Sequence, residues 1–195
     1  PSDGGHDPVS FVALIQQHVV LDAAADRVAD DRGAVQRLVH QVPALAGGRA
    51  DPALAAWLDG AIADAVVFLD NVIEANHYPF AAVENATRRT RKIGLGVMGL
   101  AELFARIGLA YDSEQALILG EKIAKFLTAE AWAASAMLGA RRGSFPSFAD
   151  SVWPGRGFTA LRNAALTCVA PTGTISLIAG TSSAIEPFFA LALAR

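Results

Sequence analysis

The stretch Leu166-Thr-Cys-Val-Ala-Pro-Thr-Gly-Thr-Ile-Ser176 changes within a few residues from an apolar run to a small, hydroxyl-rich turn. Its first part predicts a buried β-strand over residues 163–169, because short apolar runs bounded by turn residues are typical of sheet interiors. Its second part predicts a turn that opens a short helix over residues 175–179. A strand that leads directly into a helix is a unit of α/β folds. This stretch therefore predicts an α/β protein.

Residues 92–100 carry an earlier unit of the same kind. They read Lys-Ile-Gly-Leu-Gly-Val-Met-Gly-Leu and predict a buried strand that turns tightly into a helix over residues 100–107. A third strand is expected over residues 187–194, which completes an alternating α/β pattern. The glycines have the spacing of a dinucleotide-binding fingerprint, but no acidic residue closes a second strand about 20 residues later. Close packing of strand against helix is therefore the favoured use of these glycines.

Helices are expected to fill most of the remaining chain, in keeping with its high alanine content. A long helix is predicted from Pro52 to Asn76, because Asp51 is a suitable N-cap and apolar residues recur every three to four positions. Two more helices are predicted over residues 81–89 and 114–138.

The first 50 residues differ from the rest of the chain. Residues 8–21 have apolar side chains at helical spacing, and an acidic patch and a linker rich in proline and glycine follow. We therefore divide the chain into residues 1–50, a helical or divergent segment of unknown role, and residues 51–195. Because the chain begins at Pro1 and ends directly after an apolar run, we expect it to be a piece of a longer polypeptide.

The overall composition excludes several classes of protein. With 195 residues, of which 53% are apolar and 18% charged, the chain suits one domain or a large part of one, and its apolar content argues against intrinsic disorder. The net charge of −3 argues against a protein that coats nucleic acid. No apolar run reaches the roughly 18–20 residues of a membrane span, so a cytoplasmic protein is expected. The single cysteine, Cys168, excludes an internal disulfide and a multi-cysteine metal site.

The turn over residues 170–176 is the strongest candidate for a binding site. A helix N-terminus presents backbone N–H groups without partners, and the helix dipole favours negative charge there. Gly173 lets a ligand approach the backbone, and Thr172, Thr174 and Ser176 supply hydroxyl donors. The turn contains no lysine, so it is not a Walker A loop. A phosphate cradle is one interpretation, and a helix start capped by Ser or Thr without a ligand is the other.

Other reactive side chains favour structural roles. Cys168 lies in a predicted buried strand, where a small apolar role is more common than a catalytic thiol. Glu102 and Glu186 lie beside turns of small residues and are candidate acids or bases, although salt bridges and capping are more common roles. His77 is interpreted as a helix-end residue. The basic residues among positions 88–92 are interpreted as structural, because cations oppose the negative end of a helix dipole.

Several motifs, taken in order, resemble the large-subunit family of ribonucleotide reductases. The resemblance covers about residues 52–195 and is strongest to the adenosylcobalamin-dependent (class II) branch, with a metal-radical (class I) relative as the alternative. The motifs are Phe68-Leu-Asp-Asn-Val-Ile73, Arg91-Lys-Ile-Gly-Leu-Gly-Val-Met-Gly99, Arg162-Asn163, Leu166-Thr-Cys-Val-Ala-Pro-Thr-Gly-Thr-Ile-Ser176, Ile178-Ala-Gly-Thr-Ser-Ser183 and Ile185-Glu-Pro-Phe-Phe-Ala190.

This resemblance implies a fold, a cofactor and a set of partners. The family fold is a ten-stranded α/β barrel made of two half-barrels, and this helix-rich chain would supply part of the second half. Adenosylcobalamin would be the cofactor and the remainder of the reductase chain a partner, and a homodimer is one assembly open to it. Neither a membrane nor nucleic acid is expected as a partner. The turn would bind the phosphates of a ribonucleotide substrate through Pro171, Thr172, Gly173, Thr174, Ile175 and Ser176.

The implied activity is that of a ribonucleoside-diphosphate reductase, a radical enzyme that makes deoxyribonucleotides for DNA synthesis. In the family, a cysteine thiyl radical takes the 3′ hydrogen of the ribose, and two further cysteines supply electrons. The thiyl cysteine lies in an Asn-x-Cys-x-Glu motif that this sequence lacks. We therefore expect no catalytic residue and no metal ligand here, and an inactive segment in isolation. The alternatives are a truncated, non-catalytic nucleotide-binding relative and a helical structural domain in which the glycine turns serve packing.

Overall fold

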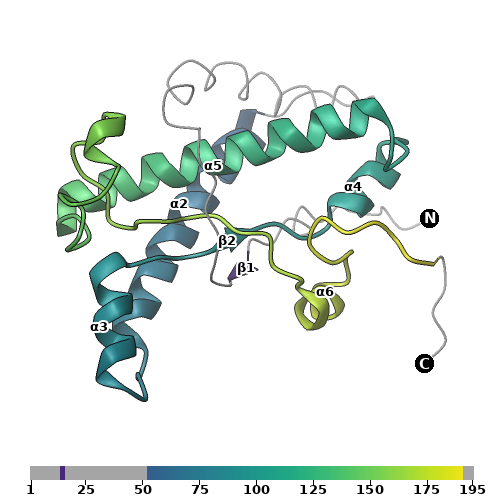
Figure 1. The fold of residues 1–195 in the computed structure, drawn as a ribbon. Helices are drawn as coiled ribbons and strands as arrows, with labels where there is room; N and C mark the ends of the chain where they lie inside the picture. The colour runs from purple at the N-terminus through teal and green to yellow at the C-terminus, as the bar shows by residue number, and fades with distance from the viewer. Residues whose placement is uncertain (1–13, 16–51, 191–195) are drawn as a thin grey trace.

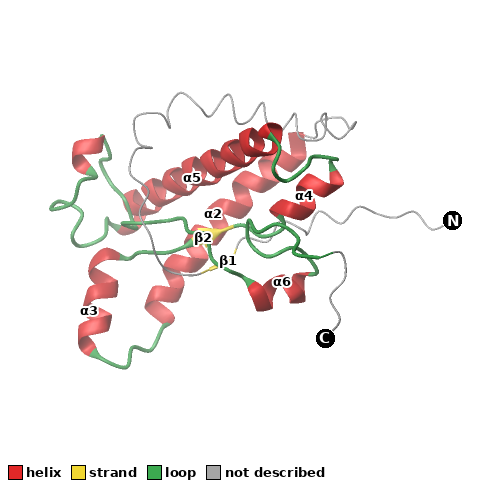
Figure 2. Ribbon diagram, turned by 45° about the vertical axis from the view of Figure 1, so that its right-hand side comes forward, coloured by secondary structure: helices red, strands yellow, loops and turns green. Residues whose placement is uncertain are grey.

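The computed structural model describes residues 14–15 and 52–190 of the chain, and helices dominate this part (Figure 1 and Figure 2). Among the helices in these ranges, none is long and apolar enough to cross a membrane. In chain order, the elements are β1 (Leu14–Ile15), α2 (Pro52–Ala75), α3 (Ala81–Thr90), β2 (Leu95–Gly96), α4 (Leu100–Arg106), α5 (Glu114–Arg142), the 3-10 helix η2 (Pro154–Arg156) and α6 (Gly173–Ala179).

Helices α2 and α5 cross each other and supply much of the core (Figure 1). On α2, the side chains of Ile62, Val66 and Leu69 follow one another at helical spacing and are buried. On α5, Trp132 and Leu138 are buried in the same way. The apolar periodicity therefore predicted both α2 and its buried face. Helix α5 continues beyond its predicted end at residue 138, to Arg142.

The chain after α5 returns across this helix and touches it closely. A Cβ atom on Gly139 would lie 2.9 Å from backbone atoms of Leu161 and Arg162. At the same crossing, the amide of Arg162 donates a hydrogen bond to the carbonyl of Ser135 at 3.1 Å. Glycine is therefore required at position 139 for the backbones to approach this closely.

The strand predicted over residues 163–169 is not regular. These residues run parallel to β2, but a single bridge, between Leu95 and Thr167, joins the two segments. Ile93 and Leu95 are two residues apart, but the carbonyls that accept their hydrogen bonds belong to adjacent residues, Ala165 and Leu166. Such an offset interrupts a ladder of hydrogen bonds. The apolar pattern does not encode this offset. The bonds run from Ile93 N to Ala165 O (3.0 Å), from Leu95 N to Leu166 O (2.7 Å) and from Cys168 N to Leu95 O (2.9 Å).

The helical spacing of apolar residues over 8–21 is not matched by a helix at the two positions that the structure describes. Leu14 and Ile15 form β1, which pairs antiparallel with β2 and places Leu14 opposite Gly96. Short apolar runs suit a helix or a strand equally well, and here the partner decides the outcome. The remainder of residues 1–50 lies outside the described residues.

The third predicted strand, residues 187–194, is also wrong where it is described. Residues 187–190 form no strand, and Phe188 and Phe189 are exposed. A strand needs a neighbour for its backbone groups. Among the described loop residues, the most C-terminal backbone hydrogen bond runs from the Glu186 amide to the Ser183 carbonyl, and none involves residues 187–190. Residues 191–194 lie outside the described residues.

A second, smaller apolar cluster joins α4 to α5. It contains Leu100 and Phe104 from α4 and Ala116 and Leu119 from α5. The tight turn predicted before α4 is present, with Gly99 at φ 83°, a conformation that favours glycine.

Candidate functional site

The predicted phosphate turn lies at the start of α6, which begins at Gly173, two residues earlier than predicted. The amide of Ser176 makes the first hydrogen bond of the helical type, to the Thr172 carbonyl at 2.9 Å. The three amides before it, those of residues 173–175, therefore have no acceptor within the helix. Gly173 and Thr174 are exposed, and no atom lies within 4 Å of the place where a Cβ on Gly173 would stand. The start of α6 thus faces open space.

The three hydroxyls singled out in this turn lie in different surroundings. The Thr172 Oγ1 accepts a hydrogen bond from the Ala184 amide at 2.7 Å. Ser176 is buried, and its Oγ donates to the Gly173 carbonyl at 3.1 Å. Thr174 is exposed. Two of the hydroxyls therefore hold the turn in shape, and the third belongs to an exposed residue.

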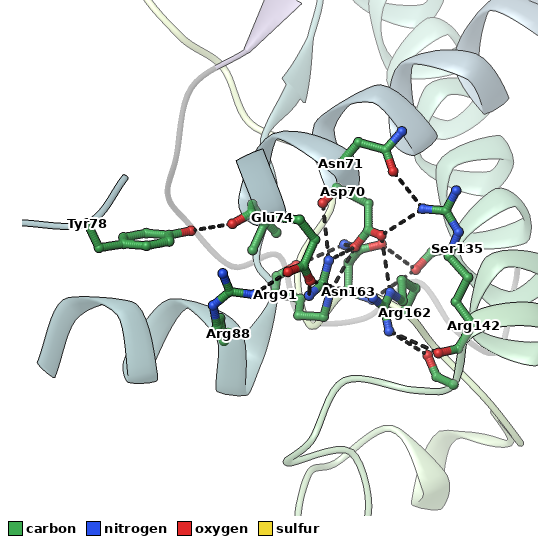
Figure 3. Close-up of polar contacts among 12 residues, drawn as sticks. Asp70, Asn71, Glu74, Tyr78, Arg88, Arg91, Ser135, Arg142, Arg162 and Asn163 are labelled. Carbon is green, nitrogen blue, oxygen red and sulfur yellow. Dashed lines mark hydrogen bonds and ion pairs between the residues drawn. The ribbon is translucent and has the colours of Figure 1, made fainter. Parts of the chain in front are cut away.

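A second polar site lies in the interior, where α2, α3, α5 and the returning chain meet (Figure 3). At its centre is Asp70, a carboxylate on the buried face of α2 with no exposed surface. We call this site the Asp70 cluster. Its members are Asp70, Asn71, Glu74, Arg88, Arg91, Ser135, Arg142, Arg162 and Asn163.

Both carboxylate oxygens of Asp70 accept hydrogen bonds from neighbouring side chains. The Oδ1 atom accepts hydrogen bonds from Arg91 Nε at 2.9 Å and from Asn163 Nδ2 at 3.1 Å. The Oδ2 atom accepts one from Arg162 Nε at 3.1 Å, and Arg142 Nη1 lies 3.4 Å away. A buried charge requires partners of this kind, because its desolvation is otherwise uncompensated.

Asn163 connects this carboxylate to α5. Its Nδ2 also donates to the Arg91 carbonyl at 2.9 Å, and its Oδ1 accepts from Ser135 Oγ at 3.0 Å. Its backbone amide donates to the same Ser135 hydroxyl at 3.1 Å. The start of the 163–169 segment is therefore fixed to both crossing helices.

Glu74 forms the outer, solvent-facing edge of the cluster. Arg91 and then Arg88 donate hydrogen bonds to it and hold the pKa of its carboxyl below the ordinary value. The distance from Arg91 Nη1 to Glu74 Oε1 is 2.5 Å. Two members of the basic group at 88–92 thus pair with carboxylates of α2. These residues therefore interact with side-chain carboxylates as well as with the helix dipole.

The Asp70 cluster was missed in the sequence, although a signal for it exists. Asp70 falls in line with Val66 and Ile73 on the apolar face of α2, and a carboxylate at such a position needs partners. The partners themselves leave no local trace, because they lie 21 to 93 residues away in the chain.

The remaining candidates lie apart from one another. Cys168 is only partly buried, which corrects the expectation of a fully buried strand residue, and its amide bonds to Leu95. His77 is exposed beyond the end of α2. Thr181 and then Arg106 donate hydrogen bonds to Glu102 and lower the pKa of its carboxyl. Within the described ranges, no group of three or more His, Cys, Asp or Glu side chains is placed to hold a metal ion.

The described residues thus combine long helices with one antiparallel pair of short strands and one parallel bridge. The family model "Ribonucleotide reductase, barrel domain" matches residues 53–160 and 156–195. The chain therefore belongs to the ribonucleotide reductase barrel-domain family. As a barrel fragment it is rich in helix, and its described part has almost no regular strand.

Within the family, the chain is similar to vitamin B12-dependent reductases. It is 50% identical over 153 residues to the "Vitamin B12-dependent ribonucleoside-diphosphate reductase" of Mycobacterium tuberculosis, covering 77% of this chain and 21% of that protein. It is 49% identical over 128 residues to the protein of the same name from Thermoplasma acidophilum, covering 66% of this chain and 16% of that protein. The chain thus spans about a fifth of the length of these relatives.

A solved structure agrees with this assignment. The Actinobacillus ureae class Id ribonucleotide reductase alpha subunit superposes with a TM-score of 0.57 and 30% sequence identity. The match covers 66% of this chain and 24% of that one.

A cobalamin cofactor is implied by the names of these relatives, and the described residues do not fit one. Imidazole is a common metal ligand, but the one described histidine, His77, is exposed and lies beyond the end of α2. The backbone amide of Cys168 donates a hydrogen bond to the carbonyl of Leu95 in β2, so this residue serves the pairing of the two segments. We therefore assign no step to the cofactor within this segment.

Proposed function

We propose that this chain is part of the barrel of an adenosylcobalamin-dependent ribonucleotide reductase and that residues 171–176 bind the phosphates of the ribonucleotide substrate. The exposed start of α6 is the observation that carries the proposal. There, three amides without a helical acceptor lie beside the open space at Gly173. An anion placed there accepts their hydrogen bonds and is favoured by the helix dipole.

Thr174 is exposed, and its hydroxyl would add a donor to those amides. Hydrogen bonds to charged groups contribute about 1.5–3 kcal/mol each. The names of the relatives specify ribonucleoside diphosphates, and a diphosphate provides enough acceptor oxygens for several such bonds. This agreement supports a nucleoside diphosphate as the substrate.

We further propose that residues 51–195 form part of the second half of a ten-stranded barrel, with residues 1–50 as a separate segment. The rest of the reductase would then cover apolar side chains that this chain leaves exposed. Large exposed apolar surfaces are typical of interfaces. Five such side chains between positions 169 and 189 are more than half exposed: Val169, Leu177, Ile178, Phe188 and Phe189.

The reaction itself requires groups that these 195 residues do not contain. Replacement of a ribose hydroxyl by hydrogen releases water and consumes two electrons, which two thiols supply as they form a disulfide. The chain has one cysteine. We therefore assign substrate binding to this segment, and the radical and reducing thiols to the remainder of the reductase.

A titration of the ¹⁵N-labelled 195-residue chain with inorganic pyrophosphate tests the binding site. We expect the amide signals of residues 173–175 to shift, with a dissociation constant on the order of 1 mM, about −4 kcal/mol. In Gly173→Leu, the new side chain fills the open space at the turn, so binding should be lost while the melting temperature stays unchanged. Gly155→Leu is the matched control, because it adds the same side chain at another glycine with open space. Equal affinity in wild type and Gly173→Leu would reject the turn as the site.

A chimera tests membership in a working reductase. Residues 53–195 replace the matching part of the Mycobacterium tuberculosis relative, and ribonucleotide reduction is measured with adenosylcobalamin. Activity within about tenfold of the parent, a barrier change of roughly 1.4 kcal/mol, is the expected result. A folded but inactive chimera would favour the non-catalytic nucleotide-binding relative.

A further inference from the structure

Residues 181–185 form a link between the start of α4 and the turn before α6, and we call them the bridging segment. In Figure 1 this part of the chain leaves α6 and passes beside α4. The amide of Gly99, at the start of α4, donates to the Ser182 carbonyl at 2.9 Å. The amide of Glu102 donates to the Ser182 Oγ at 3.3 Å. The bridging segment is therefore held by the first turn of α4.

The strongest contact on the α4 side joins two side chains. Thr181 Oγ1 donates a hydrogen bond to Glu102 Oε2 at 2.6 Å. A hydroxyl that donates to an ionised carboxylate at this distance makes a charge-assisted bond, roughly twice as strong as a neutral one. The other oxygen of the same carboxylate accepts from Arg106 Nε at 2.9 Å, and Arg106 is largely exposed.

On its other side, the bridging segment holds both ends of the turn. The amide of Thr181 donates to the Ser176 carbonyl at 3.0 Å. The hydroxyls of Ser183 and Ser176 lie 2.9 Å apart, and the Ala184 amide donates to Thr172 Oγ1 at 2.7 Å. Residues 172 and 176, which flank the open amides, are thus fastened to the same five-residue segment.

The backbone of the turn needs this support. Thr172 has φ 53° and Ala184 has φ 39°, and both values lie in the left-handed region that L side chains rarely adopt. A β-branched residue persists there only when its surroundings over-determine the conformation. The hydrogen bond from Ala184 to Thr172 joins the two strained residues directly.

We propose that Glu102 and Thr181 are positioning residues for the turn over residues 171–176. Through the bridging segment, they hold Thr172 in the left-handed conformation that opens the amides of residues 173–175 to a phosphate group. This proposal rests on the proposed function of the turn. It adds a role for α4, which carries Glu102.

Substitutions at Thr181, in the whole 195-residue chain, separate positioning from folding. In Thr181→Val the shape is kept and the donor is lost, so the signals of residues 172–175 should shift before any ligand is added. Pyrophosphate affinity should fall by about tenfold, equivalent to 1.4 kcal/mol. Thr181→Ser retains the hydroxyl and should restore both the signals and the affinity. The α2 and α5 signals should be the same in all of these proteins.

Changes at the other partner of Glu102 provide the matched control. Arg106→Met removes the second hydrogen-bond donor to this carboxylate but leaves the bond from Thr181, so the turn signals and the affinity should match wild type. In Glu102→Ala, both bonds are lost, and the effect should equal that of Thr181→Val.

The outcomes separate this proposal from the proposed function. If wild type fails to bind pyrophosphate, phosphate binding is rejected, and positioning is judged on the ligand-free signals of the turn. Unchanged turn signals in Thr181→Val and Glu102→Ala would overturn positioning. Failure of Thr181→Ser to restore the turn, or loss of the α2 and α5 signals in Thr181→Val, would also overturn it, because the bond would then serve folding in general.

Discussion

The crossing of α2 and α5 and the region around α6 are stabilised in different ways. At the crossing, apolar side chains such as Val66 and Trp132 are buried around Asp70, and both carboxylate oxygens of Asp70 accept hydrogen bonds. Around α6, backbone and hydroxyl hydrogen bonds hold the chain, and apolar side chains such as Ile178 are exposed. The first region therefore forms a scaffold of its own, whereas the second presents a turn and an apolar surface to other groups. The difference indicates that the buried core and the turn proposed to bind phosphate belong to separate parts of the chain.

The largest expected effect is at the centre of the scaffold. Asp70→Asn removes the charge that compensates Arg91, which is itself buried. Removal of one partner from a buried ion pair costs about 3–5 kcal/mol. Urea unfolding should show this loss as a lower midpoint with an unchanged slope.

The control for this variant is Asp64→Asn. Asp64 is an exposed carboxylate on the same helix, and its loss should change stability by less than about 0.5 kcal/mol. Similar midpoints for the two variants would show that the Asp70 cluster does not hold the scaffold together.

A pair of glycine substitutions sharpens the description of the crossing. Gly139→Ala places a methyl group 2.9 Å from backbone atoms, and overpacking of this kind costs about 1–3 kcal/mol. Gly60→Ala, in α2, meets no atom within 4 Å and should stabilise the helix by about 0.5–1 kcal/mol. Opposite signs in thermal or urea unfolding are expected. Stabilisation by both variants would mean that the returning chain does not touch α5 at Gly139.

Local patterns predicted the scaffold well. The spacing of Ile62, Val66 and Leu69 determined α2 and its buried face, because helix periodicity depends on neighbouring residues alone. Of the strands, the one predicted within residues 92–100 is present as β2, and the others were predicted poorly. Leu14 and Ile15 became a strand through their pairing with β2, and residues 187–190 remained without one. Pairing depends on segments that lie far away in the chain.

The same difference between local and distant signals applies to the candidate site. The sequence predicted a helix start near Gly173 with small residues around it, and α6 begins there. It gave no sign that Thr172 adopts a left-handed conformation, because a β-branched residue is among the least suited to it. The bond from Ala184 that accompanies this conformation comes from twelve residues further on. Phosphate binding at the turn stays a prediction.

A smaller effect is expected at the turn itself. Thr172→Val keeps the branched shape but leaves the Ala184 amide without its acceptor, at a cost of about 1 kcal/mol. Because this bond fixes the turn, pyrophosphate binding should weaken more than global stability does. Thr159→Val, at an exposed loop position, is the control and should leave both quantities unchanged. A loss of stability as large as that of Asp70→Asn would show that the turn belongs to the scaffold.

The smallest effect concerns the outer edge of the Asp70 cluster and depends on pH. Because Arg91 and Arg88 lower the pKa of Glu74 in the folded chain, this carboxylate stabilises the fold above its ordinary pKa of 4.5. That contribution is lost as the pH falls through the lowered value. The side chain is half exposed, so the stability difference between wild type and Glu74→Gln should be at most about 1 kcal/mol at pH 7. Urea midpoints measured from pH 7 to pH 3 should converge at the acid end, and a difference that widens on acidification would contradict this role for Glu74.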